Sequence, residues 1–325
     1  MRLLASLGVL LLLALAIAVA LGEAPLDASQ YAAAFLKPGS GPAEILWGLR
    51  APRAIAAALV GAQLGLAGAV MQGLLRNPLA DPGVLGVSAF AALGASIVIA
   101  SGLAGVPGAI ETAAMAGALV AGAVVAGLAA RLREPEALIL FGVALSAVGG
   151  AATALVFNLS PSPIMEAEVM NWLLGSAADR GWRDIAAALA PTLAGAGLTT
   201  YAAGGLRVLT LGEETASLSG LPMARLRAAA VAGAALLTGA AVAMTGVIGF
   251  VGLAAPHLVR GSASDDPVAT LAPSALAGAI LLVLADLAAR VIPTPEELKL
   301  GVVTALVGGP AFAVFAWRAA RSWRS

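Results

Sequence analysis

The chain has 325 residues, of which 60% are hydrophobic and only 11% are charged, and its formal net charge is zero. A soluble protein uses about 25% charged residues to solvate its surface, so this composition excludes an ordinary water-soluble fold. The neutral balance gives no case for nucleic-acid binding, and the absence of cysteine excludes disulfides and thiolate metal sites.

Hydropathy and helix-breaking residues predict an all-α membrane protein with about ten transmembrane helices in one domain, residues 1–325. A spanning helix needs roughly 20 apolar residues, because the hydrocarbon core is about 30 Å thick. The predicted spans, in chain order, are 3–21, 51–71, 84–100, 108–130, 137–157, 185–204, 228–247, 248–259, 268–289 and 301–317. A short apolar piece, 169–175, is expected to be re-entrant or interfacial.

The first 21 residues also fit a cleaved signal peptide, although an apolar run of 19 residues favours a retained first helix. With ten spans, both termini lie on one side of the membrane. If that side is cytoplasmic, 11 of the basic residues fall inside and 7 outside, in agreement with the positive-inside rule.

Arginines mark the outer end of two predicted helices. Arg50 and Arg53 stand three residues apart at the start of the second span, and Arg290 ends the ninth. Guanidinium groups bind carboxylates bidentately, which favours docking of an acidic partner. Snorkelling to the membrane interface explains the same positions, so the residues alone leave both interpretations open. Asp286, four residues before Arg290, is expected to pair with it, because an intramembrane charge is normally paired.

Glycine and proline positions predict further local features. Gly61, Gly65 and Gly68 place small residues on one helix face, as close helix packing in membranes requires. The segments 245–261 and 306–312 combine Gly with Pro and are expected to break helical hydrogen bonding, so they must face protein or water.

Two polar stretches lie on the expected cytoplasmic side. The loop RNPLADPG, residues 76–83, has two prolines and Asp81, which favour a fixed turn over a solvated linker. The region 205–227 is expected to form two short helices that are separated by Gly220, with Pro222 in the first turn of the second. Such a knob suits a groove on another protein, although a plain connector is the alternative.

No catalytic constellation is recognisable in the sequence. It has no G-x-x-x-x-G-K-[ST] phosphate loop, so any ATP hydrolysis belongs to a partner chain. His257 is the only histidine and cannot make a metal site by itself. We therefore expect a protein that is not an enzyme, with no catalytic, cofactor-binding or metal-binding residues of its own.

Seven motifs in order resemble the membrane subunit of type II ABC importers, which move haem, ferric siderophores and vitamin B12. They are LRAPR, MQGLLRNPLADPGVLGVSA, WLLGSAADRGW, LGEETASLSGLP, TGVIGFVGLAAPHLVR, LADLAAR and EELKLGVVTALVGGP. The family usually reads ELPxG before the last helix, where this chain has Glu297-Leu298-Lys299-Leu300-Gly301. The missing proline and the added Lys299 are expected to alter the geometry of the segment before the last helix.

The resemblance implies a multi-pass subunit of the bacterial inner membrane that imports a metal chelate as a homodimer. Two cytoplasmic ATPases and one periplasmic binding protein are its implied partners. Residues matching Arg50, Arg53 and Arg290 meet glutamates of the binding protein, and residues matching Asn77 and Leu79 lie by the cytoplasmic gate. The residues implied in coupling to the ATPase are Leu211, Gly212, Glu213, Glu214, Ser219, Gly220, Leu221, Pro222 and Arg225.

Two alternatives stay open. An ion-coupled secondary transporter needs buried acidic coupling residues, for which Asp286 is the only good candidate. A related ABC permease for zinc or manganese is expected to show more His and carboxylate residues along its path. The sequence does not distinguish haem, a ferric siderophore and cobalamin as cargo.

Overall fold

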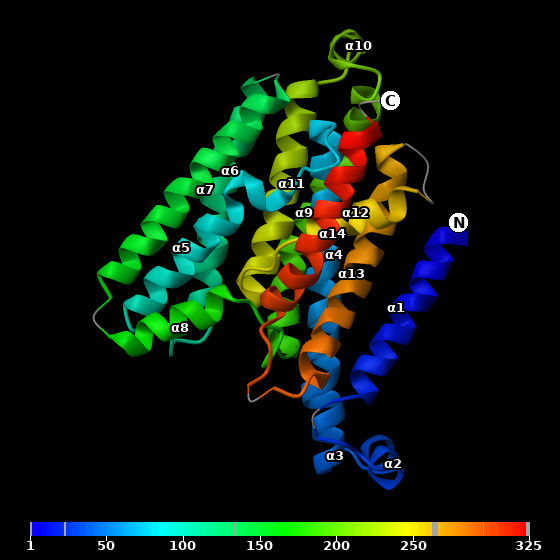
Figure 1. Cartoon of the computed structure of the whole chain (residues 1–325), viewed down its shortest axis with the longest axis vertical. Helices are drawn as coiled ribbons and strands as arrows, with labels where there is room; N and C mark the ends of the chain where they lie inside the picture. The colour runs from blue at the N-terminus through cyan, green and yellow to red at the C-terminus, as the bar shows by residue number, and fades with distance from the viewer. Residues whose placement is uncertain are drawn as a thin grey trace.

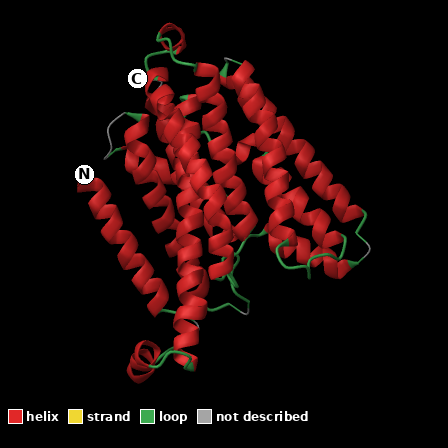
Figure 2. Ribbon diagram, turned by 180° about the vertical axis from the view of Figure 1, so that it is seen from behind, coloured by secondary structure: helices red, strands yellow, loops and turns green. Residues whose placement is uncertain are grey.

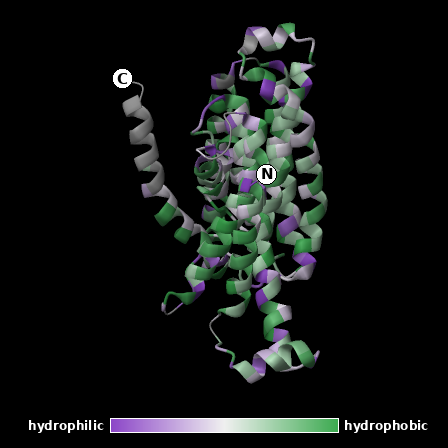
Figure 3. Ribbon diagram, turned by 90° about the vertical axis from the view of Figure 1, so that its right-hand side faces the viewer, coloured by the Kyte–Doolittle hydropathy of each residue, from purple (hydrophilic) through white to green (hydrophobic). Residues whose placement is uncertain are grey.

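A computed structural model describes residues 2–22, 24–132, 134–160, 162–261, 266–294 and 296–322, with side chains described except at 135, 213, 311–312 and 314–322. Among these residues the chain folds into helices without any strand (Figures 1 and 2). Hydrophobic residues cover much of the length of the helices (Figure 3), as a lipid environment requires.

Ten of the helices correspond to the ten predicted spans. They are α1 (Arg2–Ala20), α4 (Ala51–Leu75), α5 (Val87–Ala100), α6 (Ala109–Arg131), α7 (Pro135–Asn158), α9 (Trp182–Leu209), α11 (Met223–Thr245), α12 (Val251–Arg260), α13 (Pro267–Val291) and α14 (Leu300–Ser322). In the described part, seven helices are long and apolar enough to cross a membrane, and α5 and the first part of α14 (Leu300–Pro310) are shorter apolar segments. α12 has only 10 residues. The all-α multi-span prediction is confirmed.

Several short elements lie between the long helices. The expected loop before the second span contains α2 (Ala28–Leu36), α3 (Gly41–Ala43) and a π-helical segment, η1 (Glu44–Arg50), which continues directly into α4. The loop after α4 contains a 3₁₀ turn, η2 (Pro82–Leu85). The short apolar piece belongs to α8 (Pro163–Leu173), which packs against α5.

The core is built around α4 and α11, the most completely buried of the long helices. Gly61 and Gly65 on α4 face the α13 backbone so closely that a Cβ would overlap the carbonyl oxygens of Gly278 and Ser274. Gly68 meets α12 in the same way at Gly252. The predicted small-residue face is therefore confirmed. Its close packing brings the start of α4, which carries Arg53, next to the end of α13, which carries Arg290.

The two predicted breaks had different outcomes. Between α11 and α12 the helix is interrupted as expected, with positive φ at Gly246 (73°) and Phe250 (67°). The freed Thr245 carbonyl accepts the backbone N–H of Ser176 at 2.7 Å, so protein satisfies it. At 306–312 the helix itself is not interrupted, because α14 continues through Pro310. Proline has no N–H, so it removes one helical hydrogen bond there without ending the helix.

The short helices mark opposite ends of the bundle. Figure 1 shows α10 (Glu213–Leu218) projecting at one end and α2 and α3 lying at the other. The second short helix that we expected after Gly220 is instead the beginning of α11, which runs unbroken from Met223. Gly220 has φ 75° and makes the turn between α10 and α11.

Candidate functional site

At the α2–α3 end, four charged side chains form an ion-pair network that we call the arginine cluster: Arg53, Asp286, Arg290 and Glu297. Arg53 in the first turn of α4 donates from Nη2 to Asp286 Oδ1 at 2.8 Å and from Nε to the same oxygen at 3.0 Å. It also binds Glu297 through both terminal nitrogens, with Nη1 3.0 Å from Oε2. One guanidinium therefore joins α4, α13 and the segment before α14.

Asp286 is the buried centre of this cluster. It is only 1% exposed, and its Oδ2 lies 3.1 Å from Nε of Arg290, one helical turn further along α13. The predicted pair between Asp286 and Arg290 is confirmed. Its second partner, Arg53, comes from 233 positions away in the chain, a proximity that helix periodicity does not encode.

Arg50 is not part of this network. Its side chain is buried and turns toward the end of α1, where Nη1 donates to the carbonyl oxygen of Ala20 at 2.8 Å and Nη2 to that of Ala24. A cation at a helix C-terminus satisfies orphan carbonyls and complements the helix dipole. Arg50 therefore fastens α1 to α4, and the docking role expected for it stays a prediction.

A cavity of about 580 Å³ opens beside the arginine cluster. Its lining includes Arg50, Arg53, Arg290 and Glu297, together with Arg180, which pairs with Glu111 at 2.9 Å. The structure thus gathers the three predicted docking arginines around one space. Sequence analysis did not predict that Glu297 and Arg180 line this cavity, although both stand in motifs that carried the family resemblance.

At the other end, the loop after α4 has the fixed conformation that its composition predicts. Asn77 Oδ1 accepts the N–H of Leu79 at 2.9 Å, and Asp81 Oδ1 accepts the N–H of Gly83 at 2.7 Å. Arg76 precedes them with φ 48°. Asn77 and Leu79 are half-buried here, and their gating role stays a prediction.

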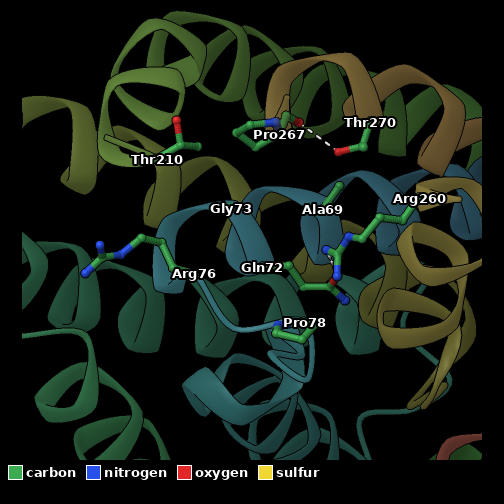
Figure 4. A pocket seen from close by; sticks show the side chains of 9 residues that line it. All are labelled: Ala69, Gln72, Gly73, Arg76, Pro78, Thr210, Arg260, Pro267 and Thr270. Atoms are coloured by element: carbon green, nitrogen blue, oxygen red, sulfur yellow. Dashed lines mark hydrogen bonds between the residues drawn. The ribbon is translucent and has the colours of Figure 1, made fainter. Parts of the chain in front are cut away.

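A smaller cavity of about 310 Å³ adjoins this loop and is shown in Figure 4. Arg260 points toward Gln72 and donates to its Oε1 at 2.7 Å, and Gln72 in turn donates to the Leu253 carbonyl at 3.3 Å. Arg76 points away from that pair. These bonds tie the end of α12 to α4 beside the loop.

The segment 211–222, which we call the α10 knob, exposes apolar side chains. Leu218 is 81% exposed and Leu211 68% exposed. Gly212, with φ 101°, starts α10, and Pro222 precedes α11. The other predicted coupling residues with described side chains are also exposed: Glu214, Ser219, Gly220, Leu221, Pro222 and Arg225. The Glu213 side chain lies outside the described residues.

No metal-binding cluster occurs in the part of the chain that the structure describes, where no group of three or more His, Cys, Asp or Glu side chains could hold an ion. The two ends of the bundle thus present a charged cavity at the α2–α3 end and an apolar knob at the α10 end.

Comparison with known proteins gives concordant results. The chain matches the FecCD transport family over residues 10–318. It is 40% identical to the uncharacterized ABC transporter permease protein YvrB of Bacillus subtilis (strain 168) over 86% of this chain and 81% of the relative. It is 37% identical to the vitamin B12 import system permease protein BtuC of Salmonella schwarzengrund (strain CVM19633), over 99% and 96% of the two chains.

A solved structure shares the fold. It is an inward-facing conformation of a metal-chelate type ABC transporter, with a TM-score of 0.87 and 28% sequence identity, and the alignment covers 98% of this chain and 99% of that one. The fold therefore agrees with that of the solved transporter over nearly the whole chain.

Proposed function

The chain belongs to the FecCD transport family and is a type II ABC importer permease, and from this premise we propose that it passes a metal chelate across the bacterial inner membrane. The cargo class is haem, a ferric siderophore or cobalamin. The observation that carries the proposal is the full-length similarity to a vitamin B12 import permease. Transport permeases of this family are normally non-catalytic, which agrees with the sequence.

Partners are assigned to the two ends of the bundle. We place a periplasmic binding protein at the arginine cluster, since guanidinium groups select carboxylates. One ATPase is placed at the α10 knob of each subunit, so that a homodimer binds two, because the exposed leucines of the knob need an apolar groove on a partner. The subunit acts as a homodimer, with both termini cytoplasmic, and ATP is bound by the partner alone.

The ion-coupled alternative is not favoured. Its one candidate coupling residue, Asp286, already holds two arginines in ion pairs. These ion pairs account for the burial of Asp286 by a structural role within the bundle, so its presence in α13 is no evidence for ion coupling. The zinc or manganese alternative gains no support either, because the described residues contain no ligand cluster for such an ion.

The test is reconstitution of the purified chain with its ATPase and binding protein in liposomes. Haem, a ferric siderophore and cyanocobalamin are offered separately, and uptake is followed by absorbance of the trapped cargo. We expect uptake of one class only, dependent on ATP and on the binding protein. Uptake that runs on an ion gradient without the ATPase would overturn the proposal in favour of a secondary transporter.

A further inference from the structure

Three of the four arginines that line the large cavity, Arg50, Arg53 and Arg290, differ in how many hydrogen-bond partners their side chains have. Arg50 binds backbone carbonyls of the α1 end, and Arg53 binds two carboxylates. Arg290 is 8% exposed, yet its Nη2 has no hydrogen-bond partner among the described residues, and its Nε meets only the Asp286 ion pair. A buried donor without an acceptor is costly, so the cavity wall holds a cation whose hydrogen-bonding capacity the described residues do not fill.

The residues that line the cavity carry unequal charges, with four arginines (Arg50, Arg53, Arg180 and Arg290) against two carboxylates (Asp179 and Glu297). The two carboxylates that bind Arg53 differ in accessibility, because the Asp286 side chain is 2% exposed and that of Glu297 is 25% exposed. Asp286 is therefore a permanent part of the core, whereas Glu297 lies where an incoming group can reach its partner.

Glu297 makes the same kind of contact that an external carboxylate would make. It grips Arg53 through both terminal nitrogens, the bidentate geometry in which guanidinium binds carboxylate best. It is carried by the short segment between α13 and α14, not by a helix. A loop carboxylate can leave such a contact with less rearrangement than one fixed on a packed helix.

We propose that Glu297 is an internal substitute for the partner's carboxylate, and that docking exchanges one for the other on Arg53. The inference rests on the proposed function, because it requires an acidic binding protein at this cavity. In the free subunit Glu297 keeps Arg53 paired and oriented. During docking the incoming carboxylate displaces it and Arg290 gains its missing acceptor, so Glu297 lowers the apparent affinity of the partner.

The carboxylate exchange on Arg53 would take place beside the start of α14, the last helix. Glu297 lies three residues before Leu300, whose N–H donates to the Gly175 carbonyl at 2.9 Å, and the Gly301 N–H donates to Leu174 at 3.1 Å. These two bonds hold the first turn of α14 against the end of α8. Release of Glu297 therefore loosens the segment that leads directly into α14.

The direct test is Glu297→Gln in the full permease–ATPase complex, with binding-protein affinity measured in nanodiscs. Removing the competing charge should tighten the Kd by about tenfold, since a like charge facing the incoming carboxylate opposes its binding. Glu297→Asp should stay near the wild type. Glu296→Gln removes the same charge from the exposed neighbouring residue and should leave the Kd unchanged. A Kd for Glu297→Gln that is equal to or weaker than the wild type overturns the inference.

A second readout does not depend on that variant. The chain has no cysteine, so Thr294→Cys gives a single labelling position on the exposed segment before α14. A fluorophore there should change emission when the binding protein is added, and an unchanged emission overturns the exchange. If the wild-type complex binds no binding protein at all, the proposed function itself fails, which separates the two outcomes.

Discussion

The two ends of the bundle, to which we assign different partners, present opposite kinds of surface. At the α2–α3 end, the charges of the arginine cluster are mostly buried and paired with each other, as in Arg53 with Asp286 at 2.8 Å. At the α10 end, Leu211 and Leu218 stand exposed with most of their side-chain surface uncovered. At the α2–α3 end, carboxylates of the same chain hold the arginine side chains in place. At the α10 end, an apolar surface is left uncovered.

The difference follows from what each group costs when it is alone. A buried guanidinium without a counter-ion is strongly destabilising, so the fold must supply carboxylates before any partner arrives. An exposed leucine costs the monomer little and gains only when a partner covers it. Charged recognition therefore requires an internal network, and apolar recognition requires only a rigid, protruding support.

Loss of Asp286 should have the largest effect at the charged end. Asp286→Asn leaves Arg53 and Arg290 close together without their shared counter-ion, and breaking a buried pair in this way costs about 3–5 kcal/mol. We expect the free energy of unfolding, measured by denaturant titration in mixed micelles, to fall by that order. Glu296→Gln is the control for charge alone. A stability equal to the wild type would show that the network does not support the fold.

The next largest effect is expected for Arg53, the residue that links the fold to the proposed docking. Arg53→Gln removes the bidentate donor, and truncating one partner of a buried charge pair at an interface costs about 2–5 kcal/mol. Binding-protein affinity should fall accordingly. Arg183→Gln removes the same charge from an exposed residue in the first turn of α9 and should change affinity little. Equal losses in both variants would mean that general electrostatic attraction, not this cluster, holds the partner.

Sequence alone predicted the helices and one ion pair of the arginine cluster, that of Asp286 with Arg290. Apolar runs fix where a chain can span lipid, and i, i+4 spacing on one helix predicts the pair of Asp286 with Arg290. The pairing of Arg53 with Asp286 and Glu297 depends on how α4 packs against α13. The glycines at 61, 65 and 68 indicated close packing but not its partner.

Local exceptions explain the remaining differences. Arg50 and Arg53 look equivalent in the sequence, yet the π-helical segment before α4 ends at Arg50 and its side chain lies toward α1. Pro310 is a helix-breaking residue by type but lies within the continuous helix α14. In both cases the tertiary surroundings decide, since neighbouring groups accept or replace the hydrogen bonds that local rules assume.

At the open end, the expected effect is smaller in free energy but specific to one partner. Leu218→Asp replaces an 81% exposed side chain, so folding should be unchanged while the ATPase loses an apolar contact of the kind worth about 2 kcal/mol at an interface centre. Retention of the ATPase during purification and ATP-driven uptake should both fall. Leu36→Asp on α2, 79% exposed at the opposite end, is the matched control and should retain the ATPase. Loss in both would contradict the assignment of the α10 knob.

The smallest expected effect tests whether an exposed ion pair contributes as much to folding stability as a buried one. Arg207 and Asp266 pair at 2.6 Å near the α10 end, and the hydrogen bond from Arg207 lowers the pKa of Asp266. A lowered folded-state pKa gives stability that is present above the unfolded value of about 4 and is lost as the pH falls through the folded value.

Asp266→Asn removes the charge but keeps an acceptor for the α13 cap, where Asp266 Oδ1 binds the Val268 N–H. Thermal scans at pH 7 should therefore place the variant close to the wild type, with their small difference vanishing on acidification, because solvent-exposed pairs contribute little. A difference as large as that of Asp286→Asn would show that burial does not separate the two ends.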